Sequence, residues 1–215
     1  MKKIIIFGSG GFFKEQFYWL KDSLKKKDYE ILAIVSKESQ SLKLFNVPII
    51  TEKEIPKSKN IFLYIAIGSI NVRAKIIKKF YNYNFYTLIH PSAIVSKGAR
   101  IGKGCIISPN TVIAGDPKVG DFNVFNFNSM ISHDCVTGEN NIFSPGSKVL
   151  GWCRMGNNNY LGAGSVMLPK TSIGNNNIIG ANATLNRNFK NSLTLIGTPA
   201  KKYKIKKLRL ATKYK

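Results

Sequence analysis

The chain has 215 residues, a hydrophobic fraction of 44% and a formal net charge of +22. This length suits one large domain or two small ones, and no apolar run approaches the roughly 20 residues that span a bilayer. The composition therefore excludes a helical membrane protein and favours a folded, soluble chain.

The basic charge is compatible with several kinds of partner. The lysines are spread along the chain, so we expect no nucleic-acid binding through a basic patch. The charge equally suits anionic small ligands such as nucleotides and coenzyme A, or peripheral contact with an anionic membrane. The apolar segment at residues 4–7 is short and a glycine-rich turn follows it, which predicts a cytoplasmic protein rather than an exported one.

Residues 1–88 alternate between strand and helix patterns. The order of these patterns implies a small parallel sheet with covering helices, similar to half of a nucleotide-binding α/β fold. Apolar runs predict strands at residues 3–7, 31–35, 61–67 and 85–89, and helical spacing predicts helices at residues 12–27 and 71–81.

Two glycine-containing turns follow predicted strands, at the edge of the sheet where such folds bind ligands. The turn Gly8-Ser9-Gly10-Gly11 would present backbone N–H groups and a helix N-terminus to an anion, and the second turn begins at Gly68. The first turn does not continue as Gly-x-Gly-x-x-Gly, which argues against a redox dinucleotide. Alternatively, the glycines serve only the backbone geometry of a tight turn. The sequence leaves both interpretations open.

From residue 90 the chain follows a period of six residues. Such a period fits neither the helical repeat nor simple strand alternation, and it is typical of a coiled β-structure whose repeats bury their apolar residues against one another. Only Thr137 departs from the apolar rule. The positions are Val95, Ile101, Ile107, Ile113, Val119, Phe125, Ile131, Thr137, Phe143, Val149, Met155, Leu161, Met167, Ile173, Ile179 and Leu185.

The fifth position of each hexad, counted from the apolar residue, carries a small or turn-forming residue, as the corners of a flat three-sided coil require. Three hexads make one coil, so residues 18 apart should stack at the strand spacing of roughly 4.8 Å. The three cysteines, Cys105, Cys135 and Cys153, all occupy this fifth position. They form no Cys-x-x-Cys pair, so we expect free thiols with a packing role.

This combination resembles the bacterial sugar acyltransferases of the hexapeptide-repeat superfamily, in particular the group that acetylates amino sugars or sialic acids for surface glycans. The resemblance rests on the α/β start, the hexads, and three segments: residues 89–93 (IHPSA), 131–138 (ISHDCVTG) and 196–201 (IGTPAK).

The resemblance implies a division into three parts. Residues 1–88 would form a Rossmann-like α/β domain that binds a sugar nucleotide, and residues 89–200 a left-handed parallel β-helix that carries the acyltransferase chemistry. Residues 201–215 would form a basic tail. The resemblance also implies a homotrimer with active sites between neighbouring β-helices.

His133 is the candidate general base. It is the only histidine within the repeats, and a neutral imidazole can remove a proton from an amine or hydroxyl near pH 7. Asp134 would orient the ring and stabilise the imidazolium. Gly151 lies 18 residues after His133, so its backbone N–H should approach a bound thioester carbonyl from the next coil.

The resemblance also places the coenzyme and the acceptor. Acetyl-CoA would lie between two β-helices, past Ala163 and Ala181, with Lys201 near its phosphates. Ile142 stands where relatives often carry a histidine that contacts the coenzyme. The acceptor sugar or nucleotide-sugar would meet Gly8, Gly10, Gly11, Phe12 and Gly68; relatives usually carry a histidine in place of Phe12, and many carry Asp-Asp in place of Val35-Ser36.

The sequence thus predicts an acetyl-CoA-dependent N- or O-acetyltransferase for surface polysaccharide, which works by direct transfer and without a metal. A zinc carbonic anhydrase on the same β-helix would need three histidine ligands, and the repeats contain one. The alternative from another class is a non-catalytic basic scaffold that binds anionic glycan, membrane or nucleic acid.

Overall fold

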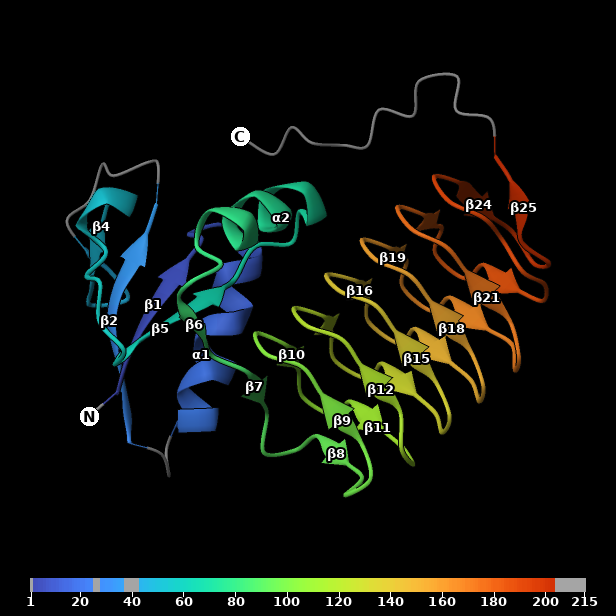
Figure 1. Cartoon of the computed structure of the whole chain (residues 1–215), viewed down its shortest axis with the longest axis horizontal. Helices are drawn as coiled ribbons and strands as arrows, with labels where there is room; N and C mark the ends of the chain where they lie inside the picture. Colours follow the sequence, from blue (N-terminus) through green and yellow to red (C-terminus); the bar gives the residue numbers. More distant parts are fainter. Residues whose placement is uncertain (1, 25–27, 37–42, 204–215) are drawn as a thin grey trace.

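The protein consists of an α/β domain and a parallel β-helix (Figure 1). The computed structural model describes residues 2–24, 28–36 and 43–203. Successive coils of the β-helix stack away from the α/β domain, so the last coil lies at the far end of the molecule (Figure 1). The expected fold class, an α/β domain followed by a left-handed β-helix, is confirmed.

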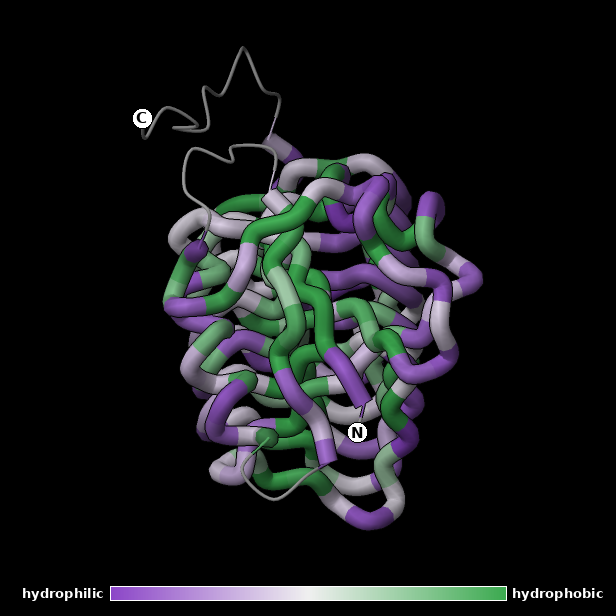
Figure 2. Tube along the Cα trace, turned by 90° about the vertical axis from the view of Figure 1, so that its left-hand side faces the viewer, coloured by the Kyte–Doolittle hydropathy of each residue, from purple (hydrophilic) through white to green (hydrophobic). Residues whose placement is uncertain are grey.

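The sheet of the α/β domain has six strands in the order β3-β4-β2-β1-β5-β6. Neighbouring strands are parallel except in the β3–β4 hairpin. Its central strands are hydrophobic, as the green tube in Figure 2 shows. The strands are β1 (Lys2–Phe7), β2 (Tyr29–Val35), β3 (Lys43–Leu44), β4 (Val47–Ile50), β5 (Ile61–Ile65) and β6 (Asn84–Phe85), and a short 3₁₀ helix (Glu52–Glu54) follows β4.

Two helices cover opposite faces of this sheet because successive side chains of a strand point to opposite sides. Ile4 and Ile6 pack in the apolar cluster of α1 (Gly11–Leu24), whereas Ile5 and Phe7 pack in the cluster of α2 (Ile70–Lys79). The α1 cluster also contains residues of the β-helix, namely Leu88, Ile106, Val124 and Ile142. The α1 face of the domain therefore joins it to the β-helix.

The β-helix has three sheets whose strands are two or three residues long. The first sheet consists of β7 (Leu88–Ile89), β10 (Ile106–Ile107), β13 (Val124–Phe125), β16 (Ile142–Phe143), β19 (Tyr160–Leu161), β22 (Ile178–Ile179), β24 (Thr194–Ile196) and β25 (Lys201–Lys202). The second consists of β8 (Ile94–Val95), β11 (Val112–Ile113), β14 (Met130–Ile131), β17 (Lys148–Val149), β20 (Val166–Met167) and β23 (Thr184–Leu185). The third consists of β9 (Arg100–Ile101), β12 (Lys118–Val119), β15 (Val136–Thr137), β18 (Arg154–Met155) and β21 (Ser172–Ile173).

Each coil turns three corners, which we name by their residues. The histidine corner joins the second sheet to the third and contains residues 115–117, 133–135, 151–153 and 169–171. The asparagine corner joins the third sheet to the first and contains residues 121–123, 139–141, 157–159 and 175–177. The alanine corner joins the first sheet to the second and contains residues 127–129, 145–147, 163–165 and 181–183.

The predicted stacking of residues 18 apart is confirmed by the strand register, in which Met130 pairs with Lys148 and Val136 with Arg154. The apolar residues of the hexads from Ile107 onward fill the interior, and all three cysteines are buried free thiols. Burial raises the pKa of the Cys105 thiol to about 12.

A ladder of buried asparagines runs through the asparagine corner. Asn141 donates from its backbone N–H and its side-chain Nδ2 to Asn123 Oδ1, at 2.9 and 3.0 Å. Asn159 donates in the same way to Asn141 Oδ1, and Asn177 to Asn159 Oδ1. The side chains thereby satisfy backbone donors that the tight corner leaves unpaired.

Arg73 of α2 joins the two domains from a fully buried position. Its guanidinium donates to the carbonyl oxygens of Ile65 and Phe122, both at 2.8 Å, and to Asn140 Oδ1 at 3.1 Å. Burial lowers the pKa of Arg73 to about 10, so the side chain stays charged at neutral pH. Because Phe122 and Asn140 lie at the asparagine corner, this arginine fixes α2 against that corner.

Two expectations about the elements differ from the structure. The single strand predicted over residues 85–89 is wrong: β6 ends at Phe85 in the α/β sheet, and β7 begins at Leu88 in the β-helix. The chain changes sheets between them, because Phe85 belongs to the α2 cluster and Leu88 to the α1 cluster. The β3–β4 hairpin was not expected, since its loop residues Phe45 and Asn46 have positive φ without the usual Asn-Gly signal.

The segment expected as a basic tail begins with a strand. Lys201 and Lys202 form β25, which pairs antiparallel with β24. Residues 204–215 lie outside the described residues.

Candidate active site

The histidine corner brings His133 and Asp134 together at the surface. The Nδ1 atom of His133 lies 2.8 Å from Asp134 Oδ2, and the two side chains are 48% and 46% exposed. Asp134 is itself held by the coil before it, since its backbone N–H donates to Asp116 Oδ1 at 3.1 Å. The carboxylate contact at Nδ1 leaves Nε2 of the imidazole as the nitrogen that can face a substrate.

Glycines flank His133 on both sides of the stack. A Cβ atom on Gly115 would lie 2.6 Å from His133 Cβ, and a Cβ atom on Gly151 would lie 2.7 Å from Cε1 and 2.8 Å from Nε2 of the ring. All three distances are far shorter than an ordinary carbon contact of about 3.5–4.0 Å. The absence of a side chain at Gly115 makes room for the Cβ and backbone of His133, and its absence at Gly151 makes room for the ring.

Gly151 also has a free backbone donor. Within the part of the chain that the structure describes, its N–H donates to no acceptor, whereas the N–H of Trp152 donates to His133 O at 3.2 Å. Gly151 itself lies against the His133 ring, as a residue that supplies an oxyanion donor must lie close to the base. The structure thus brings His133, Asp134 and Gly151 together as expected.

Trp152 is a component of this corner that the sequence did not predict. Its ring centroid lies 4.5 Å from that of His133, with an interplanar angle of 89°, and the residue is 50% exposed. Lys170 Nζ lies 5.6 Å from the indole centroid on the next coil. The signal was available, because adding 18 to Asp134 gives Trp152 and adding 18 again gives Lys170.

Trp152 also adopts a left-handed backbone, with φ of +59°. This conformation costs about 1–2 kcal/mol for a residue with a Cβ, and it is rare for a bulky side chain. Backbone strain of this kind often marks a functional position.

The residues expected to contact the coenzyme lie elsewhere on the β-helix. Ala163 and Ala181 are exposed and stack at the alanine corner, where Asn182 N–H donates to Ala163 O at 2.8 Å. Lys201 is exposed in β25. Ile142 is only 5% exposed and packs in the α1 cluster between the domains, so its burial argues against the coenzyme contact expected there.

A cavity of about 650 Å³ opens at the carboxyl edge of the α/β sheet, beside α2. Gly8 of the glycine turn lines this cavity. Its φ is +116°, and a Cβ atom on it would lie 2.5 Å from Ala66 O, so the close approach of the turn to the end of β5 requires glycine. Ser9 and Ser36 join the first turn to the end of β2 through their hydroxyls, 2.9 Å apart. The full lining is Gly8, Ser9, Val35, Ser36, Thr51, Glu52, Ile67, Val72, Lys75, Ile76 and Lys79.

The other residues expected to contact the acceptor do not line this cavity. A Cβ on Gly10 or Gly11 would meet open space, and Gly11 begins α1. Phe12 packs at the edge of the α1 cluster, close to Gly68. Sequence reasoning missed the polar wall of the cavity, since Glu52 and Lys75 come from elements far along the chain from the glycine turn.

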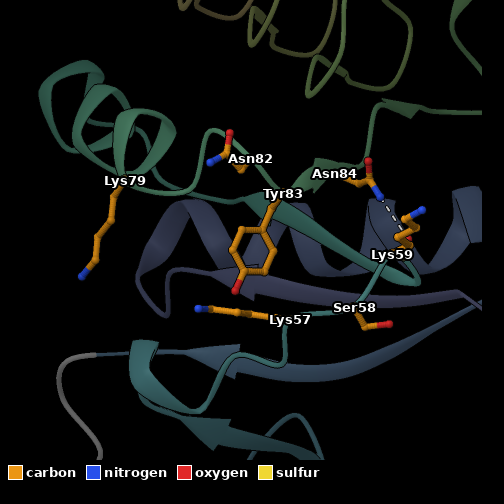
Figure 3. A pocket seen from close by; sticks show the side chains of 7 residues that line it. All are labelled: Lys57, Ser58, Lys59, Lys79, Asn82, Tyr83 and Asn84. Carbon is orange, nitrogen blue, oxygen red and sulfur yellow. Dashed lines mark hydrogen bonds between the residues drawn. The ribbon is translucent and has the colours of Figure 1, made fainter.

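A second cavity of the α/β domain, of about 710 Å³, is basic and shares Lys79 with the first cavity. Figure 3 shows Lys57, Lys59 and Lys79 around it, with Tyr83 between the two loops that form its walls. None of the residues predicted from the sequence lines it. Lys79 lies in the last turn of α2, where a cation complements the helix dipole, whereas Lys57 and Lys59 lie in the loop before β5.

The α/β domain and His133 of one chain lie on opposite sides of the β-helix. The domain packs on the first sheet and reaches the asparagine corner through Arg73 and the alanine corner through Trp19, whose ring lies 6.2 Å from that of Phe127. His133 lies at the corner between the second and third sheets, and in a three-sided coil this corner is opposite the first sheet. One chain therefore does not bring the 650 Å³ cavity to the histidine.

The described residues contain neither a cluster of metal-ligating side chains nor a membrane-spanning helix. No three His, Cys, Asp or Glu side chains there gather as a metal site requires. Neither described helix has the length and apolar character of a membrane span.

Two family models match the sequence. The model described as "PglD N-terminal domain" matches residues 3–80, and "Bacterial transferase hexapeptide (six repeats)" matches residues 153–187. Together they cover more than half of the chain. A comparison with curated proteins finds no significant match.

Solved structures match over nearly the whole length of both chains. PerB from Caulobacter crescentus, in complex with CoA and GDP-perosamine, is 27% identical with a TM-score of 0.86, covering 95% of this chain and 98% of that one. The acetyltransferase domain of PglB from Neisseria gonorrhoeae FA1090, in complex with acetyl coenzyme A, is 24% identical with a TM-score of 0.85, covering 94% and 99%. WeeI from Acinetobacter baumannii AYE is 23% identical with a TM-score of 0.85, covering 94% and 100%.

Proposed function

Since the chain belongs to the bacterial hexapeptide-repeat transferases with a PglD-type N-terminal domain, we propose that it transfers an acetyl group from acetyl-CoA to a nucleotide-linked sugar, with His133 as the general base. The protein is a sugar acetyltransferase of this superfamily. The similarity to PerB, which is described in complex with CoA and GDP-perosamine, supports a nucleotide-linked acceptor. We also propose that the product serves surface polysaccharide.

One observation carries the role of His133. Its Nδ1 atom is held by Asp134, its ring lies against Gly151, and the free N–H of Gly151 is next to it on the same open corner. A base and an oxyanion donor thus lie side by side, as acyl transfer to an amine or hydroxyl requires.

The reaction proceeds by direct transfer. The acceptor's nitrogen or oxygen attacks the thioester carbonyl carbon while His133 Nε2 removes the acceptor's proton. The Gly151 N–H donates to the oxyanion of the tetrahedral intermediate, and Asp134 stabilises the imidazolium. Collapse of the intermediate breaks the carbon–sulfur bond, and the imidazolium returns the proton to the departing thiolate.

The buried thiols support this route over a covalent acetyl-cysteine. Cys135 follows Asp134 directly, but its side chain points inward and donates to Leu150 O at 3.0 Å. Cys153 likewise donates to Leu168 O at 3.1 Å, and both residues are 1% exposed. Neither sulfur is available to attack a thioester at the surface.

We infer that the active site is completed by a second copy of the chain in a homotrimer. The acceptor cavity and His133 of one chain lie on opposite sides of the β-helix, and Ala163 and Ala181 lie at another corner than His133. The histidine and alanine corners both border the second sheet, whose outer face is largely apolar. Its outward residues are Ile94, which is 64% exposed, then Val112, Met130, Lys148, Val166 and Thr184. Packing this face against neighbours would bring the two corners of different chains together.

The catalytic proposal is tested by thiol release from acetyl-CoA with a panel of amino-sugar nucleotides that includes GDP-perosamine. We expect release only with an acceptor, and a product acetylated at one site. Resistance of the product to hydroxylamine identifies an amide, and cleavage identifies an ester. Absence of acceptor-dependent release across the panel would refute the proposal, and salt-sensitive binding without release would favour a basic scaffold.

The trimer is tested separately by light scattering of the parent and Met130→Glu. We expect a trimer for the parent. The variant places a carboxylate on the outer face of the second sheet, so it should dissociate and lose activity together. An active monomer would contradict the shared site.

A further inference from the structure

Three residues of the histidine corner adopt a left-handed backbone, and two of them, Trp152 and Lys170, carry long side chains that disfavour it. The φ angles of Asp134, Trp152 and Lys170 are +57°, +59° and +62°. Asparagine and glycine tolerate this conformation, whereas a bulky residue there is an outlier. Between residues 128 and 182, every other left-handed residue is one of these two types: Asn128, Asn140, Gly146, Asn158, Gly164, Asn176 and Asn182. Within this range the departures from asparagine and glycine all lie at the histidine corner; outside it, Phe122 of the asparagine corner and Ser192 are also left-handed.

The three departures form one connected group. Asp134 Oδ2 lies 2.8 Å from Nδ1 of the imidazole, the Trp152 ring meets the imidazole at 4.5 Å and at nearly a right angle, and Lys170 Nζ lies 5.6 Å from the indole centroid. Edge-to-face contacts between aromatic rings at this separation are attractive, and so is a cation near an indole face. Each departure thus contributes a side chain that acts on the imidazole directly or through its neighbour.

The Trp152 indole restrains the orientation of the His133 imidazole, which the contacts with Asp134, Gly115 and Gly151 do not fix. The Asp134 carboxylate is 46% exposed, so water competes for its bond to Nδ1. Gly115 and Gly151 make room for the ring but do not hold it, because they carry no side chain. Without the indole, the half-exposed imidazole would be free to turn about its Cβ–Cγ bond and carry Nε2 away from the Gly151 N–H.

We propose that Trp152 is a positioning residue that holds the His133 imidazole over Gly151, and that its strained corner conformation is retained for this contact. The proposal rests on the proposed function for its effect on catalysis. Its geometric part, the restraint of the imidazole, stands independently of which acceptor is used.

The first test compares Trp152→Asn with Trp152→Phe. Asparagine is the residue that the other corners use at this backbone angle, so Trp152→Asn should melt at the parent temperature or above it while it removes the ring. We expect kcat to fall at least tenfold, with the KM values for acetyl-CoA and acceptor within twofold of the parent. Trp152→Phe keeps an aromatic ring and should retain kcat within threefold. Ser192→Asn, which makes the same kind of change at a left-handed residue of a distant coil, should leave kcat unchanged.

The second test reads the imidazole without catalysis. Diethyl pyrocarbonate acylates accessible imidazoles, and the chain contains only His90 and His133. Mass spectrometry of the two peptides gives the rate at His133 relative to the internal reference His90. We expect this ratio to rise at least threefold in Trp152→Asn and to stay near the parent value in Trp152→Phe and Ser192→Asn.

The outcomes separate the alternatives. A lower melting temperature for Trp152→Asn would make Trp152 a structural residue and overturn the proposal. A raised KM for either substrate with unchanged kcat would make it a ligand contact, and an unchanged His133 acylation ratio would show that it does not restrain the ring; both also overturn the proposal. If the parent releases no thiol with any acceptor, the proposed function fails, and the acylation ratio still decides the role of Trp152.

Discussion

Gly151→Ala is the substitution whose effect follows most directly from the geometry of the histidine corner. The added Cβ would lie 2.7 Å from His133 Cε1 and 2.8 Å from Nε2, so the imidazole must move. Restoring a carbon contact of about 3.5–4.0 Å requires a shift of roughly 1 Å. A displacement of about 1 Å in a catalytic group costs about 100-fold in rate. This corresponds to about 2.7 kcal/mol of transition-state stabilisation.

The fold should tolerate the change. The φ angle of Gly151 is not in the left-handed region, and the atoms nearest to the added Cβ belong to a side chain at the surface. We therefore expect a melting temperature by circular dichroism close to that of the parent, and a kcat for thiol release about 100-fold lower. Gly180→Ala is the matched control, because its Cβ would first meet the flexible Ile196 side chain at 3.0 Å in a distant coil. It should retain the parent kcat.

A double substitution sharpens this prediction. If Gly151→Ala acts by displacing the imidazole, it should cost little more in a His133→Ala background, because the group that it displaces is already absent. A kcat for Gly151→Ala within threefold of the parent would refute the reasoning. So would a further 100-fold loss in the His133→Ala background.

The remaining predictions concern buried residues that stabilise the fold. Asn141→Leu removes the side-chain oxygen that accepts hydrogen bonds from Asn159 in the next coil, and it leaves those buried donors unpaired. The free energy of unfolding, measured in urea, should therefore fall by about 3 kcal/mol or more, whereas the exposed Asn186→Ala should change it hardly at all. Arg73→Met removes hydrogen bonds to both domains, so the free energy of unfolding should fall by about 2–4 kcal/mol in the same assay. A loss no larger than that of the exposed Lys78→Met would contradict the domain-joining role. The buried thiols, including Cys105, whose pKa burial raises to about 12, should not react with Ellman's reagent at pH 8 until guanidinium unfolds the protein. Reaction of the native protein within minutes would show that they are accessible.

The β-helix was predictable from the sequence because the same packing environment recurs in every coil. Each apolar residue of a hexad has the same neighbours, so one period sets the burial of Ile131, the corner of Cys135 and the 18-residue step from His133 to Gly151. The same 18-residue step leads from Asp134 to Trp152, but local propensity does not predict an aromatic residue in a left-handed corner. Such a departure is expected at a functional position, and it becomes visible only when the ring contact is known.

The acceptor side was less predictable because it depends on contacts between distant segments. Gly8 was found through its turn, but the walls contributed by Glu52 and Lys75 come from elements whose packing the sequence does not specify. The side of the β-helix on which the α/β domain docks follows from the burial of Leu88 and the contacts of Arg73, neither of which has a periodic signal. The expected strand over residues 85–89 failed for the same reason, since one apolar run served two sheets.

The central claim is that His133 is the general base of an acetyl transfer, and His133→Ala tests it most directly. Removing a general base lowers the rate by about 100- to 10,000-fold. Measured as acceptor-dependent thiol release at saturating substrates, kcat of His133→Ala should fall at least 100-fold, with an unchanged melting temperature. His90→Ala, at the only other histidine, should stay close to the parent. Activity of His133→Ala within tenfold of the parent would contradict the claim.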